Sequence, residues 1–454
     1  MAVINVNEYI SNSKFSRFHL LMFILFFIII TFDGYDMAIY SATLPVLLDA
    51  LKMDPSQAGL IASSALVGAA LGALIFGLLA DKIGRKKVII LCTVFFSIGS
   101  ILAGFSNTIY TFGFFRFIAG LGLGGIMPNI VSVTTEYAPR KNRAIMVAAI
   151  FTGMQVGGIL VSGISMWILP LLGWRILYFI GGAPLLIIPL LIKYLPESAT
   201  NLAKNNRNGE LKLILQKLRA DSALPNDVTF EFNVSGKSSL KSLFNENRGL
   251  STIAIWIVFF MNMFVSFGFS TWLPQLMINN GFGLNSGLFF LLTLNLGALI
   301  GSYIAGFIAD RIGYKTTLIG LYLIAFLSIS LLSLTTNLYA VTGLVALAGI
   351  GFFGGQNVGN AYVSLFYPPS MRSTGMGFAF GIGRLGAIFG PTIVGFIVSW
   401  GMDLYVNFLA LAIPGLIAAL AVFIIQDKCS FLYKDMVNIK EVESKSSSEN
   451  FPTL

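Results

Sequence analysis

Long apolar stretches alternate with short polar connections along most of the chain. An α-helix needs about 20 predominantly apolar residues to cross a membrane. The pattern therefore predicts an all-α membrane protein of twelve transmembrane helices, six on each side of a longer polar connection. The predicted spans are 18–45, 57–80, 88–106, 109–134, 144–168, 174–195, 250–275, 286–309, 317–336, 338–364, 375–399 and 404–426.

These spans divide the chain into five regions. They are a short N-terminus, a six-helix half, a polar loop, a second six-helix half and a tail, at 1–17, 18–196, 197–248, 249–427 and 428–454. The tail is charged and rich in serine, which predicts disorder. The first apolar stretch is too long for the core of a signal peptide, so we expect it to remain as a membrane helix.

The amino-acid composition excludes a soluble protein. Of 454 residues, 56% are hydrophobic and 11% are charged, whereas soluble domains carry roughly 25% charged residues. The 47 glycines fit close helix packing in lipid. Two cysteines, Cys92 and Cys429, indicate no disulfide framework.

The formal net charge of +9 is explained by position along the chain. If the N-terminus is cytoplasmic, the basic residues gather on the cytoplasmic side and only Lys52 and Arg175 face outward. Such asymmetry sets the topology of membrane proteins. We therefore expect a multi-pass protein of the cell (inner) membrane with both termini cytoplasmic, and no nucleic-acid partner.

A charged segment is repeated at equivalent places in the two halves. Residues 77–86 read Gly-Leu-Leu-Ala-Asp-Lys-Ile-Gly-Arg-Lys after the second span, and residues 306–315 read Gly-Phe-Ile-Ala-Asp-Arg-Ile-Gly-Tyr-Lys after the eighth. The matching spacing indicates that the six-helix halves are duplicates. Parallel halves of this kind place a substrate site between them near the membrane midplane.

Two acidic residues, Asp33 and Asp36, interrupt the first apolar stretch. An Asp at the centre of a membrane helix costs about 2.5–3.5 kcal/mol, so both need interior partners or a water-filled cavity. Their i,i+3 spacing puts them on one helix face. Neighbouring like charges and partial desolvation both favour proton uptake by a carboxylate, as proton-coupled transport requires. The alternative is a structural pair bound to arginines of neighbouring helices.

Arg116 and Arg384 are the basic residues well inside the spans, one in each half. A guanidinium can hold a carboxylate through two parallel hydrogen bonds, which suits an organic anion. We expect Arg384 to bind the substrate carboxylate and Arg116 to bind either substrate or one of the two Asp residues. We further expect Asp36 to matter more for turnover and Asp33 to be held in an ion pair.

Other polar and aromatic residues in the spans are candidates for lining a substrate path. The aromatic ones could sandwich a ring, but helix–helix hydrogen bonding is an equal alternative for the amides. They are Tyr35, Tyr40, Asn129, Gln155, Gln356, Asn357 and Phe380. The single histidine, His19, stands at the start of the first span. With no catalytic constellation or metal-ligand cluster, the sequence predicts no enzyme, no cofactor and no metal.

The repeated segment resembles the loop signature of the major facilitator superfamily. Asp33-Gly34-Tyr35-Asp36 and the run from Arg116 through Gly120, Gly122, Gly124 and Gly125 to Asn129 resemble the aromatic acid:proton symporters within it. Leu195-Pro196-Glu197-Ser198 and the Gly-rich stretch around Arg384 do so too. The resemblance implies the major facilitator fold and loops that gate the inner face. The inner-gate residues it implies are Gly77, Asp81, Gly84, Arg85, Glu136, Asp310, Arg311 and Arg372.

The leading functional hypothesis is proton-coupled import of an aromatic carboxylate such as benzoate or hydroxybenzoate by alternating access. Its partners are a small organic anion, protons and the lipid bilayer, and analogy suggests a functional monomer. One alternative is transport of a nicotinate- or muconate-like acid. A drug/proton antiporter is disfavoured because the fifth span carries no Gly-Pro pair. A non-transporting membrane sensor is disfavoured by the short loop and tail.

Overall fold

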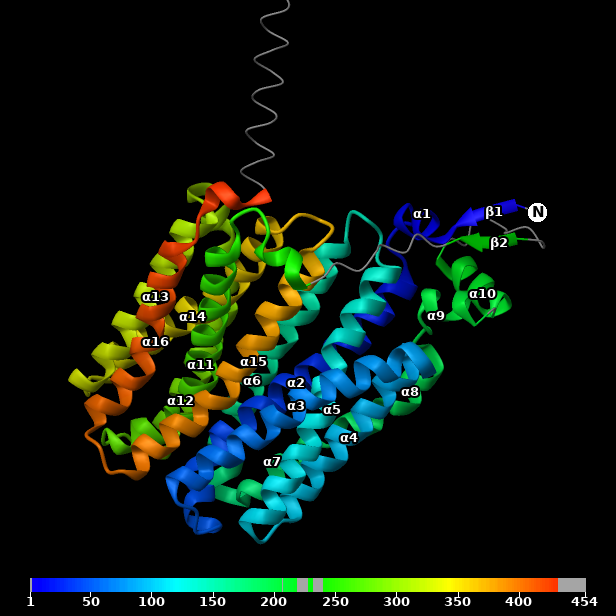
Figure 1. Cartoon of the computed structure of the whole chain (residues 1–454). Helices are drawn as coiled ribbons and strands as arrows, with labels where there is room; N and C mark the ends of the chain where they lie inside the picture. Colours follow the sequence, from blue (N-terminus) through cyan, green and yellow to red (C-terminus); the bar gives the residue numbers. More distant parts are fainter. Residues whose placement is uncertain (1, 206, 219–227, 232–239, 432–454) are drawn as a thin grey trace, which may run out of the picture. The chain divides into compact units, whose positions relative to one another are not determined.

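The structure, a computed structural model, describes residues 2–205, 207–218, 228–231 and 240–431. In these residues, 12 helices are long and apolar enough to cross a membrane (Figure 1). This confirms the predicted all-α membrane fold. The disorder predicted for the tail falls mainly on residues 432–454, which lie outside the described residues.

The spans lie close to their predicted positions, and several are longer. The first six are α2 (Arg17–Ala50), α3 (Pro55–Ile83), α4 (Arg85–Phe105), α5 (Ile109–Tyr137), α6 (Arg143–Leu172) and the pair α7 (Trp174–Gly181) and α8 (Ile188–Tyr194). The second six are α11 (Gly249–Asn279), α12 (Leu284–Ile312), α13 (Tyr314–Leu331), α14 (Leu338–Phe366), α15 (Arg372–Ser399) and α16 (Leu404–Ile424).

The sequence pattern predicted one continuous helix for the sixth span, but the structure divides this span in two. A 3₁₀ segment, Ala183–Ile187, separates α7 from α8. Two glycines precede it, and Pro184 and Pro189 follow within it and just beyond it. Proline has no backbone N–H to donate and its ring crowds the preceding turn, so the α-helical ladder is interrupted here. Hydropathy does not register this break because proline, glycine and leucine are all compatible with an apolar run.

The polar loop contains secondary structure outside the spans. Its helices are α9 (Ala199–Lys204) and α10 (Asn208–Leu218), and the N-terminus forms α1 (Val6–Ser11). Strand β1 (Ala2–Asn5) pairs in parallel with β2 (Val228–Glu231). Buried side chains of α1 and α10, including Val6, Ile10 and Leu211, join the same apolar cluster as the ends of α2 and α5. The N-terminus and the loop are therefore packed against the first set of spans.

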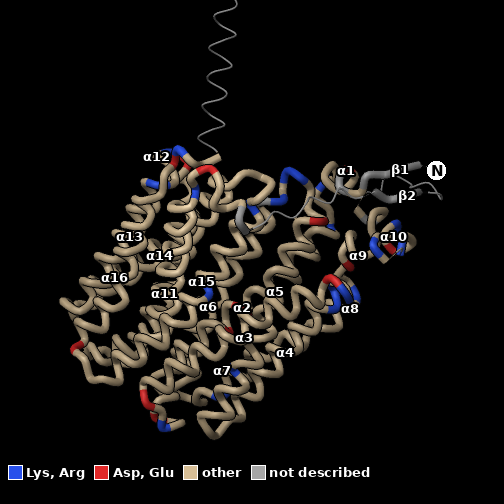
Figure 2. Tube along the Cα trace, in the orientation of Figure 1, with Lys and Arg blue, Asp and Glu red and all other residues tan. Residues whose placement is uncertain are grey.

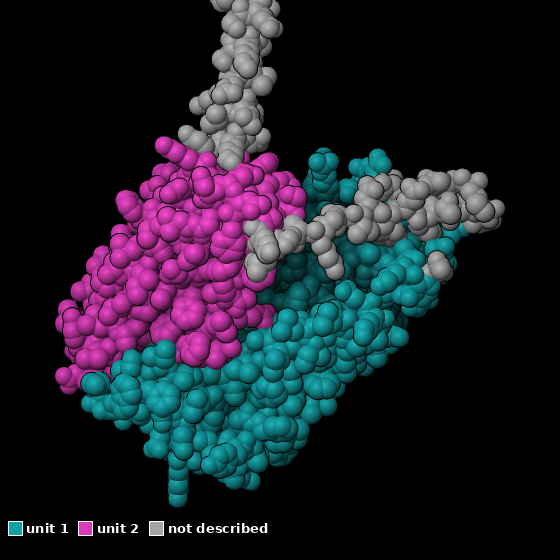
Figure 3. All heavy atoms as spheres, in the orientation of Figure 1, with its two compact units in different colours: residues 1–234, 270–296, 391–402 teal, residues 235–269, 297–390, 403–454 magenta. Residues whose placement is uncertain are grey.

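The described contacts separate the chain into two compact units (Figure 3). Unit 1 comprises residues 1–234, 270–296 and 391–402, and unit 2 comprises residues 235–269, 297–390 and 403–454. The division cuts through α11, α12 and α15 instead of following the predicted halves. The division into two duplicated halves therefore stays a prediction.

Within unit 1, glycines bring α5 into backbone contact with α3. A Cβ atom on Gly120 would lie 2.0 Å from the carbonyl oxygen of Ala65, and one on Gly124 would lie 1.9 Å from that of Ala69. On another face of α5, a Cβ on Gly122 would lie 2.5 Å from the carbonyl oxygen of Cys92 in α4. Lipid supplies no hydrophobic drive between helices, so such close backbone packing is what holds them.

Unit 1 also contains a close contact between α3 and the end of α15. The hydroxyls of Ser63 and Thr392 lie 2.6 Å apart. A Cβ on Gly59 would lie 2.6 Å from the carbonyl oxygen of Pro391, and one on Gly395 would lie 2.7 Å from that of Pro55. Small residues on both helices therefore permit this contact.

In unit 2, glycines likewise bring α15 into backbone contact with α11. A Cβ on Gly386 would lie 2.0 Å from the carbonyl oxygen of Phe260, and one on Gly390 would lie 2.4 Å from that of Phe264.

Charged residues are concentrated at helix ends and are sparse along the spans of both units (Figure 2). The few charges inside the spans are therefore the places where chemistry is expected.

A first prediction concerns the contact between α3 and α5. We expect Gly120→Val to destabilise the protein by about 1–3 kcal/mol or to prevent folding, because the new side chain overlaps the backbone of α3. The measurement is the Tm of the detergent-purified protein. Gly343→Val in α14 is the matched control, since no described atom beyond the adjacent backbone of its own helix lies within 4 Å of its Cβ position. Equal Tm values for the two variants would contradict the role of this contact.

Candidate functional site

The two acidic residues of α2 lie in the interior of unit 1. Asp33 and Asp36 are both buried, one turn apart on the helix. Gly34 lies between them, and a Cβ there would stand 2.0 Å from the carbonyl oxygen of Met154 in α6. On the facing helix, a Cβ on Gly157 would stand 1.9 Å from the carbonyl oxygen of Thr31. The glycine within the acidic motif therefore has a steric role, because α2 and α6 touch through their backbones there.

Asp36 forms a buried ion pair with Arg116 of α5. Arg116 Nη1 lies 2.6 Å from Asp36 Oδ2, and Nη2 donates to the backbone oxygen of Asp36 at 3.2 Å. The two side chains are 0% and 3% exposed. Asp36 Oδ1 and Arg116 Nε have no hydrogen-bond partner among the described residues. The pair is therefore buried, charge-balanced and not fully satisfied.

This pairing bears on the sequence-based expectation for Arg116. The prediction that Arg116 binds one of the two Asp residues is confirmed. Asp36 is the carboxylate that contacts Arg116. The expectations that Asp33 is held in an ion pair and that Asp36 matters more for turnover stay predictions. The i,i+3 spacing places both carboxylates on one face and cannot distinguish which of them α5 approaches.

Aromatic residues surround the ion pair and are tied to backbone carbonyls. The Tyr35 hydroxyl donates to the Leu177 carbonyl at 3.0 Å, and that of Tyr40 donates to the Ala58 carbonyl at 2.7 Å. The guanidinium of Arg116 lies 6.0 Å from the centre of the Tyr40 ring. Both tyrosines, which the sequence analysis offered for sandwiching a ring, are buried here and link helices.

Arg384 belongs to unit 2, where it lies on α15 beside the contact with α11. It is half-buried, and its neighbours Gly383 and Gly386 both face α11. Phe380, one turn earlier, packs its ring edge-on against Phe259 at 5.5 Å between centroids. The backbone contact between the two helices thus sets the position of the arginine along α15.

The remaining lining candidates differ in exposure. Asn129 is buried, and its amide donates to the Gly125 carbonyl of its own helix at 2.7 Å. Gln155 and Gln356 are half-buried, and Asn357 is exposed. Asn129 thus bonds within its own helix, whereas Gln356, which accepts from the Asn262 amide of α11, fits the helix–helix alternative. A path-lining role for these four residues stays a prediction.

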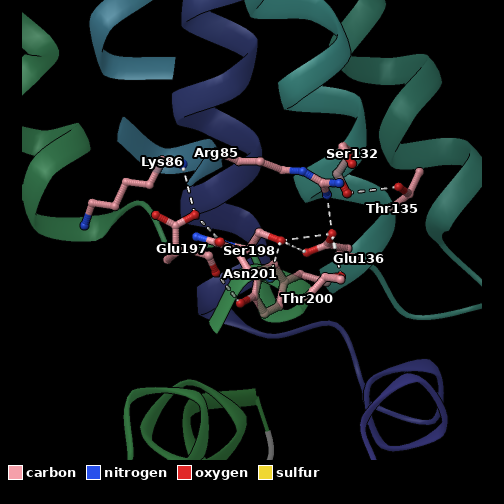
Figure 4. Close-up of polar contacts among 10 residues, drawn as sticks. Arg85, Lys86, Ser132, Thr135, Glu136, Glu197, Ser198, Thr200 and Asn201 are labelled. Carbon is pink, nitrogen blue, oxygen red and sulfur yellow. Dashed lines mark hydrogen bonds and ion pairs between the residues drawn. The ribbon is translucent and has the colours of Figure 1, made fainter. Parts of the chain in front are cut away.

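A polar cluster joins three segments at one end of unit 1 (Figure 4). Glu136, near the end of α5, forms an ion pair with Arg85 at the start of α4. Ser198 Oγ donates to Glu136 Oε2 at 2.7 Å, and Thr200 Oγ1 donates to Oε1 at 3.0 Å. Arg85 and Glu136, both inner-gate candidates from the sequence, thus contact each other, although the sequence did not predict this pairing. Ser198 and Thr200 were missed as partners, although the Pro-Glu-Ser sequence before α9 had signalled this segment.

Glu197 completes this cluster through the backbone. Its Oε1 accepts from the backbone N–H of Ser198 at 2.9 Å and from that of Lys86 at 3.3 Å. Gly84 has φ +100°, and a Cβ there would lie 2.4 Å from Glu197 Oε2. Only glycine satisfies both the backbone angle and the close approach. Gly84 is therefore a structural requirement of the cluster.

The other inner-gate candidates lie outside this cluster. No described atom beyond the adjacent backbone of its own helix lies within 4 Å of a Cβ on Gly77, and Asp81 is exposed. Asp310 accepts from the Tyr314 hydroxyl at 2.9 Å, while the guanidinium of Arg311 lies 4.2 Å from the centre of the Phe307 ring. A further candidate, Arg372, is half-buried at the start of α15, and its Nε has no hydrogen-bond partner among the described residues. Gating by these residues stays a prediction.

Known proteins resemble this chain along nearly its whole length. A family model described as the Major Facilitator Superfamily matches residues 26–355 and 289–428. The chain is 40% identical over 434 residues to the benzoate transport protein of Acinetobacter baylyi, covering 94% of this chain and 93% of the relative. It is 34% identical over 430 residues to the gallate transporter of Pseudomonas putida, covering 93% and 95%.

A solved structure supports the fold alone. A bacterial homologue of the human lysosomal transporter Spinster, inward-facing and occupied, matches with a TM-score of 0.74 at 16% identity. The match covers 92% of this chain and 98% of that one.

A second prediction concerns the Glu136 cluster. We expect Glu136→Ala to lower stability by about 1–3 kcal/mol, because Arg85, Ser198 and Thr200 lose a partly buried acceptor. Glu210→Ala is the control, since its ion pair with Arg207 is 45% and 52% exposed and is worth less than about 1 kcal/mol. Thermal unfolding of both variants in detergent gives the comparison. A control as destabilised as Glu136→Ala would refute the assignment.

Proposed function

We propose that this chain, which belongs to the major facilitator superfamily, imports an aromatic carboxylate together with protons by alternating access. The named relatives are transport proteins, and this chain is a membrane transporter, not an enzyme. Benzoate and gallate in the relatives' names favour a benzoate-like substrate. The observation that carries the coupling proposal is the buried ion pair between Asp36 and Arg116.

Protonation of Asp36 is the proposed coupling step. In the structure the Asp36 side chain is 0% exposed, so a proton can reach it only after the surrounding helices open. Proton exchange is thereby tied to particular conformations of the transport cycle. Once Asp36 is neutral, Arg116 retains a positive charge without its counter-ion, a costly state in a low-dielectric interior. An incoming organic anion would relieve that cost.

Proton and anion binding therefore favour each other. By thermodynamic reciprocity, if protonated Asp36 strengthens anion binding, bound anion strengthens protonation of Asp36 by the same factor. Arg384 is the proposed clamp for the substrate carboxylate, because its guanidinium offers paired donors and it lies half-buried inside a span. Loss of the Arg116 pair should thus impair proton coupling, whereas loss of the Arg384 clamp should impair substrate binding.

Alternating access requires contacts that close and reopen. The contact of Ser63 with Thr392 in unit 1 is a candidate for one closure, and the cluster around Glu136 is the candidate for the inner gate. The predicted charge asymmetry supports a cell (inner) membrane location with cytoplasmic termini. We further propose that a monomer suffices for transport.

The test of the proposed function uses the full-length protein in proteoliposomes. We expect an inward proton gradient to drive accumulation of labelled benzoate or hydroxybenzoate above the equilibrium level. A protonophore should abolish accumulation, and unlabelled aromatic acids should compete. Equal uptake with and without the proton gradient would exclude coupling, and no uptake of any aromatic acid would exclude the substrate class.

A third prediction separates coupling from binding. We expect Asp36→Asn to abolish proton-driven accumulation but to retain exchange of labelled for unlabelled substrate, because a neutral amide mimics the protonated carboxyl. Asp403→Asn is the control, since Asp403 is an exposed residue at the start of α16. It should accumulate substrate like the wild type. Full accumulation by Asp36→Asn would remove Asp36 from the coupling mechanism.

A further inference from the structure

The single histidine of the chain, His19, joins the start of α2 to the end of α5. Its side chain is buried, and its Nε2 lies 3.0 Å from the carbonyl oxygen of Tyr137. Its Nδ1 accepts the backbone N–H of Ser16 at 3.1 Å, which forms part of a capping box at the first turn of α2. Backbone groups of two helices therefore hold the ring at both nitrogens.

These partners fix the protonation state of the ring. A carbonyl oxygen can only accept and a backbone N–H can only donate, so Nε2 carries a hydrogen and Nδ1 carries none. A second proton would lie on Nδ1, facing the N–H of Ser16. The Ser16 hydroxyl, 2.9 Å away, could accept that proton, but the backbone N–H would then lose its acceptor. The arrangement therefore requires a neutral imidazole.

The charged groups around His19 do not stabilise the protonated ring. Besides Tyr9 and Tyr137, the titratable side chains on the surrounding segments are acidic at Glu8, Glu136 and Glu197 and basic at Lys14, Arg17, Arg140 and Arg143. Glu136 pairs with Arg85, and Glu197 accepts from the backbone N–H of Ser198. Among the described residues, no ion pair joins a carboxylate to the imidazole. A proton on His19 would therefore bring a charge into this contact without a counter-ion.

The same two helices are also joined by the ion pair of Asp36 on α2 with Arg116 on α5. With a rise of about 1.5 Å per residue, the two links lie about 25 Å apart along α2 and about 30 Å apart along α5. They therefore fasten an antiparallel helix pair at two depths. The Tyr137 hydroxyl donates to the carbonyl of Glu197, so the His19 link continues into the polar cluster around Glu136.

The second span shows that capping alone does not need a histidine. Helix α3 begins with the same kind of box, in which Gln57 Oε1 accepts the Asp54 N–H at 3.0 Å. Glutamine is the usual residue at this position and keeps its charge at every pH, whereas histidine changes its charge between about pH 5 and 8. At the start of α2, histidine therefore adds both a bond to α5 and a dependence on protons.

We propose that His19 is a pH-sensitive switch that weakens the link between α2 and α5, and so slows transport, when the compartment at the start of α2 becomes acidic. The link is complete only with the neutral ring. It is therefore present at neutral and alkaline pH and is lost as the pH falls through the range in which histidine takes up a proton. The predicted topology makes that compartment the cytoplasm. The effect on transport rests on the proposed function, whereas the effect on the helix contact does not.

The test compares the wild type with His19→Gln, which keeps a capping acceptor and cannot be protonated. The full-length proteins in proteoliposomes exchange labelled benzoate at equal pH on both sides, at about pH 7.5 and about pH 5.5. Protonation of Asp36 and of benzoate affects both proteins alike, so the ratio of their exchange rates reports on His19. Between the two pH values we expect wild-type exchange to fall about two- to tenfold relative to His19→Gln, as loss of one hydrogen bond gives.

Gln57→Ala is the matched control, because it removes the equivalent capping acceptor from a different helix. It should keep the pH dependence of the wild type. The same pH dependence in the wild type and in His19→Gln would overturn the proposal. So would a loss of pH dependence in Gln57→Ala equal to that in His19→Gln.

Hydrogen exchange of the wild type gives an outcome that needs neither a variant nor transport. After correction for the intrinsic pH dependence of amide exchange, the peptides from the start of α2 and the end of α5 should lose protection at about pH 5.5 relative to the other spans. Unchanged or uniformly changed protection would overturn the switch. A protein that shows the local loss but exchanges no aromatic acid would support the switch and overturn the proposed function alone.

Discussion

The buried ion pair between Asp36 and Arg116 is the interaction on which the rest of unit 1 depends. Neither charge could remain alone in a dry interior, where losing one partner of such a pair typically costs about 3–5 kcal/mol. The helices that carry them must therefore be held at a fixed distance.

Glycine contacts supply the fixed distance. Gly34 lets α6 touch α2 within the acidic motif, and Gly120 and Gly124 let α3 touch α5 beyond Arg116. In a bilayer, lipid tails solvate apolar side chains as well as another helix does, so close packing between backbones decides helix position. A larger residue at any of these glycines would overlap the backbone of the neighbouring helix. Packing and chemistry are thus joined in one short segment of α2.

The two units treat polar groups inside the spans differently. Unit 1 holds a charged pair whose acceptors and donors are partly unmet, whereas unit 2 holds Arg384 and neutral amides, among which Asn262 Oδ1 has no hydrogen-bond partner among the described residues. A charge in low dielectric responds to protons and anions, whereas an amide responds only to hydrogen-bond geometry. At the helix ends, where water is available, the cluster around Glu136 combines an ion pair with hydrogen bonds from neutral hydroxyl groups.

The sequence by itself determined the membrane class, the twelve spans and the charged residues within them, because the cost of polar groups in hydrocarbon is local and visible along one dimension. Only the tertiary structure decided which partners meet. It placed Asp36 on Arg116, gave Glu136 the hydroxyls of Ser198 and Thr200, and left an oxygen of Asn262 without a donor. These outcomes depend on how closely backbones approach at particular glycines, which spacing along one helix does not encode.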